Sequence, residues 1–197
     1  MKNRAVIGGM VFNEPEFYLK TKRGVKLYRF TIATERKSGY IDFLPCVVRE
    51  ENLEKIIPGA DIKISGFITT RNYTFENKRK LDIYVYAAEF NEYVEDENYI
   101  ELEGAVCKDT VFRTTPSGKE ICDVLMATNF KHISAYIPSI AWWENAKIMG
   151  ESNVGDTFDT IGRFQSRNYT KDDKNHVAYE YCITKINKGG KINGSEN

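Results

Sequence analysis

Arginine and tyrosine, two residue types that bind phosphate groups and flat rings, recur together in this 197-residue chain. The sequence Arg-Asn-Tyr-Thr occurs at Arg71–Thr74 and again at Arg167–Thr170, an offset of 167 − 71 = 96 residues. A guanidinium neutralises phosphate oxygens, and a tyrosine ring offers a flat face on which a base stacks. The repeat therefore predicts two surfaces for a polyanion that carries flat bases.

Residues that could support catalysis or metal binding are few. Asp172, Asp173 and His176 could be interpreted as an acid–base or metal cluster, but they fall at the expected tip of a hairpin, where charged side chains are ordinary. The sequence has no Gly-rich phosphate loop and no His-Glu-x-x-His motif. None of its four cysteines is spaced as Cys-x-x-Cys, and only two histidines are present. We therefore expect no catalytic residues, no metal site and no cofactor.

The repeat extends well beyond the four-residue motif. Ile7–Val11 corresponds to Leu102–Val106, and Asp42–Cys46 corresponds to Ala135–Ser139. The offsets, 102 − 7 = 95 and 135 − 42 = 93, drift only between elements, where loops accept insertions. This pattern predicts a duplicated domain.

Each half has the pattern of five strands and one short helix. Its β-branched and aromatic residues partly alternate with polar ones and are bounded by Gly, Pro, Asn and Asp. The expected strands are 4–12, 25–34, 41–48, 61–71 and 81–90, then 99–107, 119–128, 132–142, 157–167 and 177–186. The expected helices, 50–57 and 143–149, each fall between the third and fourth strands of a half.

This element order is that of the OB-fold barrel. The expected fold class is therefore all-β, with two tandem five-stranded OB-fold barrels, each with a short helix between strands 3 and 4. The expected domains are 1–92 and 98–188, followed by a polar, disordered tail at 189–197. OB folds bind oligonucleotides through strands two and three and the loops beside them. Both copies of the Arg-Asn-Tyr-Thr motif fall in the loop between strands four and five.

Charge and hydropathy restrict the function classes. The chain has 28 Lys and Arg against 28 Asp and Glu, so a strongly basic surface over the whole protein is excluded. Basic residues are instead clustered locally, at 20–26 and 78–80. No apolar run approaches the roughly 18 residues of a membrane span. The first residues lack the apolar segment of a signal peptide, so we expect a cytoplasmic location.

Three runs occur in a fixed order in the second half, at Tyr136–Trp142, Val154–Asp156 and Gly162–Tyr169. The first half carries a more diverged copy, at Asp42–Pro45 and Gly66–Tyr73. In these motifs the chain resembles the bacterial and phage single-stranded DNA-binding proteins, in a tandem OB-fold form. The resemblance covers nearly all of residues 3–188.

The resemblance implies non-catalytic, sequence-tolerant binding and protection of single-stranded DNA in replication, recombination or repair. It implies that aromatic residues stack on bases while arginines contact phosphates. The DNA-binding residues implied are Phe43, Arg71, Tyr73, Tyr136, Trp142, Arg167 and Tyr169. Most members of the family have one barrel per chain and form tetramers, so a homodimer of this chain would supply the same four barrels. Replication or recombination proteins are the further partners that it implies.

The chain also departs from the family pattern. Arg49 stands where the second half has Trp142, and the neighbouring Glu50 and Glu51 would repel phosphate. We therefore expect the second half to bind DNA more strongly than the first. The chain lacks the acidic tail, ending in Asp-Ile-Pro-Phe, with which cellular members recruit partners. An alternative function stays open, an OB-fold protein-interaction module with weak nucleic-acid binding, such as a primosome or recombination accessory factor. Each aromatic residue also has the alternative role of packing in a barrel core.

Overall fold

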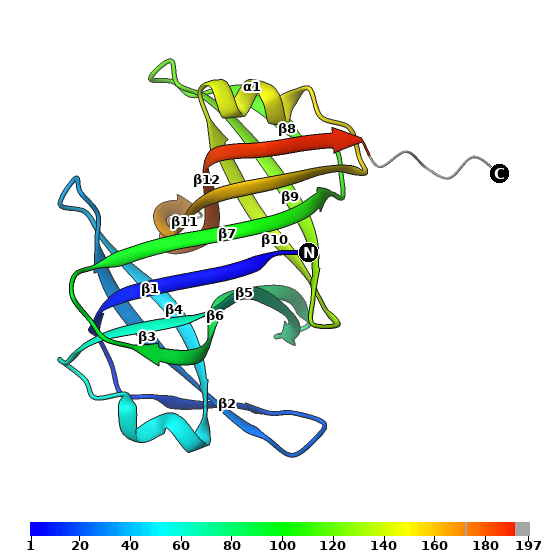
Figure 1. The fold of residues 1–197 in the computed structure, drawn as a ribbon. Helices are drawn as coiled ribbons and strands as arrows, with labels where there is room; N and C mark the ends of the chain where they lie inside the picture. Colours follow the sequence, from blue (N-terminus) through cyan, green and yellow to red (C-terminus); the bar gives the residue numbers. More distant parts are fainter. Residues whose placement is uncertain (172, 192–197) are drawn as a thin grey trace. The chain divides into compact units, whose positions relative to one another are not determined.

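The computed structural model describes residues 1–171 and 173–191, which are mostly β-strand (Figure 1). By its contacts the chain separates into two units. We call residues 4–99 with 164–179 the N-terminal unit, and residues 1–3, 100–163 and 180 onward the C-terminal unit. Compared with the expected boundaries at 92 and 98, residues 1–3 and the segment 164–179 are exchanged between the units. The boundaries of the contact-defined units therefore do not coincide with the expected linker.

The strands of the N-terminal unit form a closed ring of pairings. β1 pairs with β3, β3 with β4, β4 with β6 in parallel, β6 with β5, and β5 with β1. β2 lies outside this ring and pairs with β3. The elements are β1 (Asn3–Val11), β2 (Glu16–Lys20), β3 (Lys26–Glu35), β4 (Ile41–Arg49), the 3-10 helix η1 (Glu50–Lys55), β5 (Asp61–Phe75) and β6 (Lys78–Asn91).

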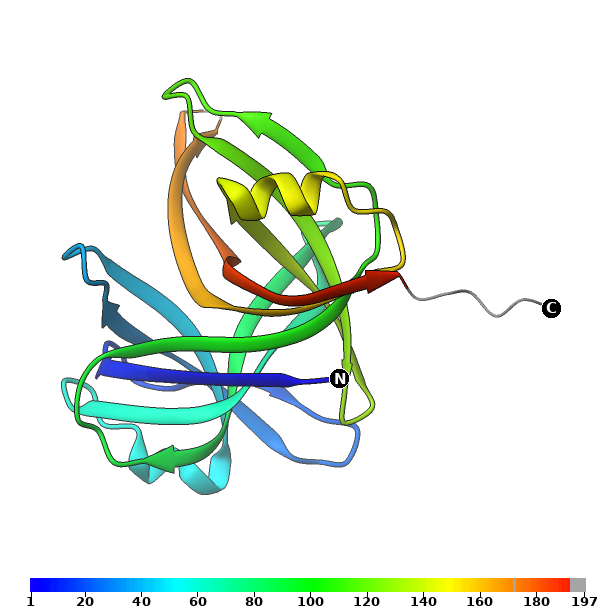
Figure 2. The same ribbon diagram turned by 45° about the horizontal axis from the view of Figure 1, so that its top comes forward.

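The second half of the chain repeats this ring. β7 pairs with β9, β9 with β10, β10 with β12 in parallel, β12 with β11, and β11 with β7. β8 pairs with β9 as β2 pairs with β3, and α1 lies against β8, β9 and β10 (Figure 2). The elements are β7 (Glu97–Val106), β8 (Val111–Thr114), β9 (Glu120–Phe130), β10 (Ile133–Trp142), α1 (Glu144–Gly150), β11 (Asp156–Lys171) and β12 (Lys174–Lys191).

The differences from the expected elements have local causes. β2 and β8 were not expected, because Glu16–Lys20 and Val111–Thr114 are short and their side chains are half-buried or exposed, which leaves no clear alternation. The helix expected at 50–57 is a 3-10 helix without buried residues. β12 runs to Lys191, so residues 189–191 lie in a strand where a tail was expected, and residues 192–197 lie outside the described residues.

Because side chains alternate between the two faces of each strand, apolar side chains from one face fill the interior of each unit. Fully buried side chains in the N-terminal unit include Ile7, Phe30, Ile32, Leu44, Ile64 and Ile68. Those in the C-terminal unit include Ile100, Leu102, Met126, Ile137 and Tyr181. No helix of the described residues has the length and apolar character needed to cross a membrane.

Two equivalent glycines allow the strand crossing that closes each ring. Gly66 lies on β5 at a register shift against β6, and a Cβ there would lie 1.7 Å from the carbonyl oxygen of Tyr86. At Gly162, 96 residues later, a Cβ would lie 2.1 Å from the carbonyl oxygen of Cys182. The glycine that precedes each Arg-Asn-Tyr-Thr motif is therefore required by close backbone approach.

We expect Gly66→Ala and Gly162→Ala each to lower the free energy of unfolding by about 3 kcal/mol or more, because a backbone carbonyl moves less readily than a side chain. Gly118→Ala is the control, since a Cβ there meets nothing within 4 Å and only its φ of 78° is unfavourable. It should cost about 1 kcal/mol. Urea denaturation followed by circular dichroism measures all three, and equal losses would contradict the steric explanation.

Candidate nucleic-acid interface

β4 and β10 present an aromatic side chain outward at the same position of the repeat. Phe43 is 39% exposed and lies opposite Ala33 of β3, and Tyr136 is 48% exposed and lies opposite Ala127 of β9. A small residue across the strand pair leaves much of the aromatic ring uncovered. Two of the seven predicted DNA-binding residues therefore have the exposure that stacking on a base requires.

Farther along the same outward faces, the two halves cover their apolar residues in different ways. In the N-terminal unit, Tyr18 and Leu19 of β2 pack against the buried cluster of Leu27, Val47 and Tyr84. In the C-terminal unit, Trp142 packs against the corresponding cluster of Ile121, Ile140 and Cys182. The open part of each face is therefore the end that carries Phe43 or Tyr136.

Trp142 is the last residue of β10, and Trp143 is the residue before α1. Trp142 lies six residues after Tyr136 on β10, so strand alternation places both side chains on one face. Trp142 is half-buried against the cluster described above, whereas Trp143 is exposed and has a φ of 55°. Trp142 thus offers a base only the part of its ring that the cluster leaves uncovered.

The acidic residues after β4 are paired. Lys26 Nζ lies 2.8 Å from Glu50 Oε1, and the hydroxyl of Tyr28 donates to the same oxygen at 3.3 Å. The hydrogen bond from Lys26 lowers the pKa of Glu50 below its usual value. Arg49 donates to the hydroxyl of Tyr86 at 2.8 Å and lies 3.4 Å from Glu51. Lysine and arginine therefore offset the phosphate repulsion that the sequence suggested for this part of the first half.

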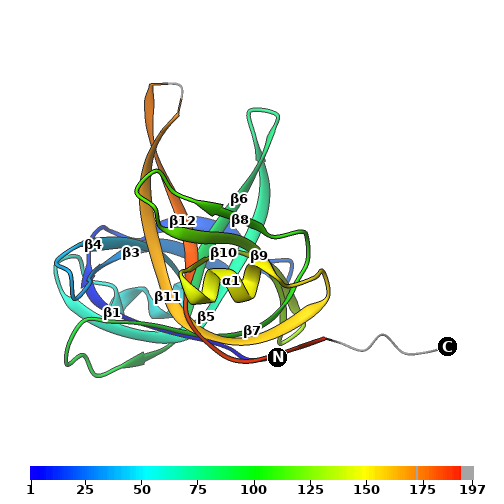
Figure 3. The ribbon, with the colours of Figure 1, turned by 90° about the horizontal axis from the view of Figure 1, so that it is seen from above.

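The β5–β6 hairpin carries Arg71 and Tyr73 and projects beyond its ring of strands (Figure 3). The guanidinium of Arg71 is 5.3 Å from the centre of the Tyr18 ring, which is within cation–π distance. The hydroxyl of Tyr18 donates to Asp82 at 3.0 Å, and burial raises the pKa of Tyr18. Tyr73 is half-buried and lies opposite Lys80 across the hairpin.

The β11–β12 hairpin has two faces of different character. Arg167 lies 5.8 Å from the centre of the Tyr169 ring, and that ring stacks on His176 at 5.3 Å. Ser166 and Asn168 alternate with Arg167 and Tyr169, so they belong to the opposite face. Of the suggested catalytic cluster, Asp172 lies outside the described residues, while His176 is taken up by this stacking.

The opposite face of this hairpin lines a cavity of about 440 Å³ in the N-terminal unit. Phe43 also lines it, so the structure brings one predicted residue together with several that sequence reasoning missed. The cavity is lined by Phe12, Tyr40, Ile41, Phe43, Ser166, Asn168, Val177 and Tyr179. The only signal in the sequence was Asn168, which is the second residue of the repeated motif. Phe12, Tyr40 and Ile41 lie at or beside strand ends, and the remaining residues lie within strands of the sheet. No local pattern reveals that these segments meet.

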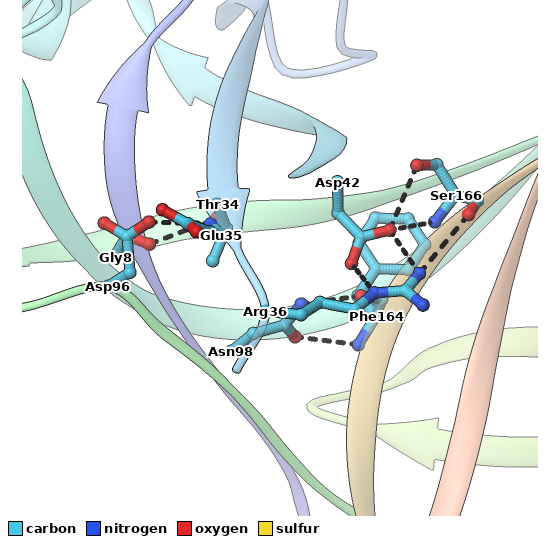
Figure 4. A network of polar contacts seen from close by, with 9 residues as sticks. All are labelled: Gly8, Thr34, Glu35, Arg36, Asp42, Asp96, Asn98, Phe164 and Ser166. Carbon is cyan, nitrogen blue, oxygen red and sulfur yellow. Dashed lines mark hydrogen bonds and ion pairs between the residues drawn. The ribbon is translucent and has the colours of Figure 1, made fainter. Parts of the chain in front are cut away.

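A buried carboxylate holds the hairpin segment at this cavity (Figure 4). The side chain of Asp42 is 0% exposed and accepts hydrogen bonds from Arg36 Nε at 2.5 Å and Nη2 at 2.6 Å. It also accepts from the backbone amide of Ser166 at 2.8 Å and from its hydroxyl at 3.0 Å. Nearby, the Asn98 side chain bonds both the amide and the carbonyl of Phe164, at 2.9 and 2.6 Å. Residues 164–166 are therefore fixed by polar contacts to the chain before residue 99.

The predicted residues thus fall into separate groups. Phe43 and the hairpin residues Arg71, Tyr73, Arg167 and Tyr169 belong to the N-terminal unit, and Tyr136 and Trp142 belong to the C-terminal unit. Among the residues that the structure describes, no cluster of three or more His, Cys, Asp or Glu could hold a metal ion. The groups at hand are aromatic rings, guanidiniums and neutral amides, which suit binding.

Comparison with solved structures identifies proteins of the same fold. The chain aligns over 100% of its length with wild-type single-stranded DNA binding protein from Thermus aquaticus, at 18% identity, a TM-score of 0.75 and 97% coverage of that chain. A deletion mutant of the Thermus aquaticus protein gives the same identity and TM-score and is 98% covered. No family model matches the sequence, and no curated protein matches it closely enough to count as a relative. The chain therefore has the fold of the Thermus aquaticus protein over its whole length.

We expect Asp42→Asn to lower the free energy of unfolding by about 3 kcal/mol, because it leaves the guanidinium of Arg36 without its buried charge partner. The backbone amide of Ser166 should also exchange hydrogen faster, since it loses a charged acceptor. Urea denaturation and hydrogen exchange measure the two effects. The control is Glu50→Gln, which removes an exposed pair and should change stability little. An Asp42→Asn protein as stable as the Glu50→Gln protein would show that the network does not hold the segment.

Proposed function

We propose that this protein binds single-stranded DNA without catalysis and with little sequence preference. The observation that carries the proposal is the pair of exposed aromatic residues, Phe43 and Tyr136, at equivalent positions of a fold shared with a single-stranded DNA binding protein. Stacking on such rings contributes roughly 1–3 kcal/mol per base and accepts any base. Coating and protecting single strands during replication, recombination or repair is the role that this chemistry suits.

Each ring of strands is, in this proposal, an OB-fold barrel with its short helix between the third and fourth strands of the ring. The closed pairings and the positions of η1 and α1 support this assignment. The OB-fold assignment supports the proposal that the chain is a tandem member of the bacterial and phage single-stranded DNA-binding proteins. A homodimer would then provide four barrels. Light scattering should give the mass of two chains, and the mass of one chain would exclude the dimer.

Arg71 and Arg167 are proposed as phosphate contacts, and Tyr73, Trp142 and Tyr169 as further stacking residues. The position of each arginine beside a tyrosine ring supports this, because a guanidinium held over an aromatic face keeps its charge. The charge balance of the chain is zero, so such local cations would supply the electrostatic part of binding. In this proposal, stacking carries more of the affinity than charge does.

The test is the affinity of Tyr136→Leu for fluorescein-labelled oligo(dT), measured by anisotropy. Loss of a stacking face should weaken binding about fivefold or more, while leucine preserves the apolar surface. Phe112→Leu is the matched control. Phe112 is 44% exposed in the same unit and pairs with Cys122 of β9. Tyr136 pairs with Ala127 of the same strand. Because Cys122 and Ala127 are five residues apart, an odd number, Phe112 and Tyr136 lie on opposite faces of the sheet.

The same titration at several salt concentrations tests the arginines. Arg167→Gln should reduce the slope of log affinity against log salt by about one, because one phosphate contact is lost. If the wild-type protein, correctly folded, does not bind oligo(dT) at low salt, the proposed function is wrong. The zero net charge would then favour a protein-interaction module, detected as capture of a protein partner independent of oligonucleotide.

A further inference from the structure

The cavity in the N-terminal unit has walls suited to a flat, apolar ring. Phe12 is 56% exposed and meets Phe43 edge to face, with ring centres 4.8 Å apart and planes at 69°. That geometry leaves a face of one ring uncovered by the other. Tyr40, Ile41 and Val177 add further exposed apolar surface. A volume of about 440 Å³ lies within the range of small-ligand sites, and is large enough for a base with part of its sugar.

The polar groups of the cavity are neutral and point to hydrogen bonding with a base edge. Asn168 is exposed, and its side chain offers both a carbonyl acceptor and amide donors. Every base edge presents donors and acceptors, so an amide can bond any of them after a small rotation. Ser166 donates its hydroxyl to Asp42 and is thereby oriented away from this role. Asn168 is thus the polar residue best placed to contact a base.

The charges near the cavity are close to balanced and leave its interior apolar. Among the residues that the structure describes, no charged side chain lines the cavity. The neighbouring carboxylate, Asp42, is buried and bonded to Arg36. The guanidinium of Arg36 lies 4.6 Å from the centre of the Tyr40 ring, and Lys37 beside it is exposed. Arg36 balances the charge of Asp42, and Lys37 and Glu35 are both exposed, so binding of a base there would depend on the apolar interior.

We propose that this cavity binds one unstacked base of single-stranded DNA, with Phe12 and Tyr40 as stacking residues and Asn168 as a contact to the base edge. The proposal rests on the proposed function and adds residues to the site. It also changes the role of the repeated motif, because in the second copy the asparagine, and not only the arginine and tyrosine, contacts DNA. Residues 164–179 would then bind DNA through both faces of their hairpin.

The first experiment compares Phe12→Leu with Phe17→Leu in the full chain. Phe17 is 59% exposed in the same unit and also meets an aromatic ring, Tyr28, edge to face, but it does not line the cavity. Both substitutions remove one exposed ring and retain an apolar side chain. Phe12→Leu should weaken binding of labelled oligo(dT) about fivefold or more, and Phe17→Leu should leave it within twofold of wild type.

The second experiment keeps the wild-type protein and places one 5-iodouracil in the oligonucleotide. Irradiation should cross-link that base to Tyr40 or Tyr179, both of which line the cavity, and mass spectrometry of the peptides identifies the residue. The inference is overturned if Phe12→Leu binds like Phe17→Leu and the cross-links fall only outside the cavity. That result, with normal wild-type binding, leaves the proposed function intact. Absence of wild-type binding overturns both.

Discussion

A single buried carboxylate organises the side of the N-terminal unit that we assign to binding. Asp42 has no exposed surface and receives four hydrogen bonds, from two nitrogens of Arg36 and from the amide and hydroxyl of Ser166. A carboxylate in this position is stable only if its charge is balanced and its oxygens are bonded. Because Ser166 lies 124 residues further along the chain, meeting that requirement fixes a distant hairpin segment beside β4. Phe43, the next residue after Asp42, lines the cavity that this arrangement creates.

The duplication does not repeat this interaction. Ala135 stands where the first half has Asp42, and it is buried in an apolar interior. The two halves therefore differ by more than Arg49 in the place of Trp142. Lysine and arginine pair with Glu50 and Glu51. The stronger difference between the two halves is the buried carboxylate of Asp42. In the N-terminal unit the hydrogen bonds of Asp42 hold Ser166 at a cavity beside the exposed ring of Phe43. In the C-terminal unit Trp142 covers an apolar cluster instead.

The sequence predicted what depends on local pattern. Alternation and turn residues gave ten strands in their observed places, and the repeat offset identified Gly66 and Gly162 as equivalent. The family resemblance selected Phe43 and Tyr136, and alternation along β4 and β10 accounts for their outward side chains. The sequence did not predict β2 and β8, whose short runs lack alternation, or the cavity, which needs segments around residues 12, 40 and 168 to meet. No periodicity reports a contact across more than a hundred residues, and a lone Asp42 gives no sign of its partner.

Zero net charge is consistent with binding a polyanion once the pairing of charges is considered. Paired glutamates such as Glu50 contribute little repulsion, because a lysine lies within 2.8 Å. Two cations lie beside aromatic rings, Arg71 over Tyr18 and Arg167 over Tyr169, and they act over short range. In the proposed function, long-range attraction of DNA is then weak, and affinity depends on ring faces that are exposed before the strand binds. Fixing those rings in advance lowers the ordering cost of binding, which is why the buried Asp42 network matters for a surface that it does not itself form.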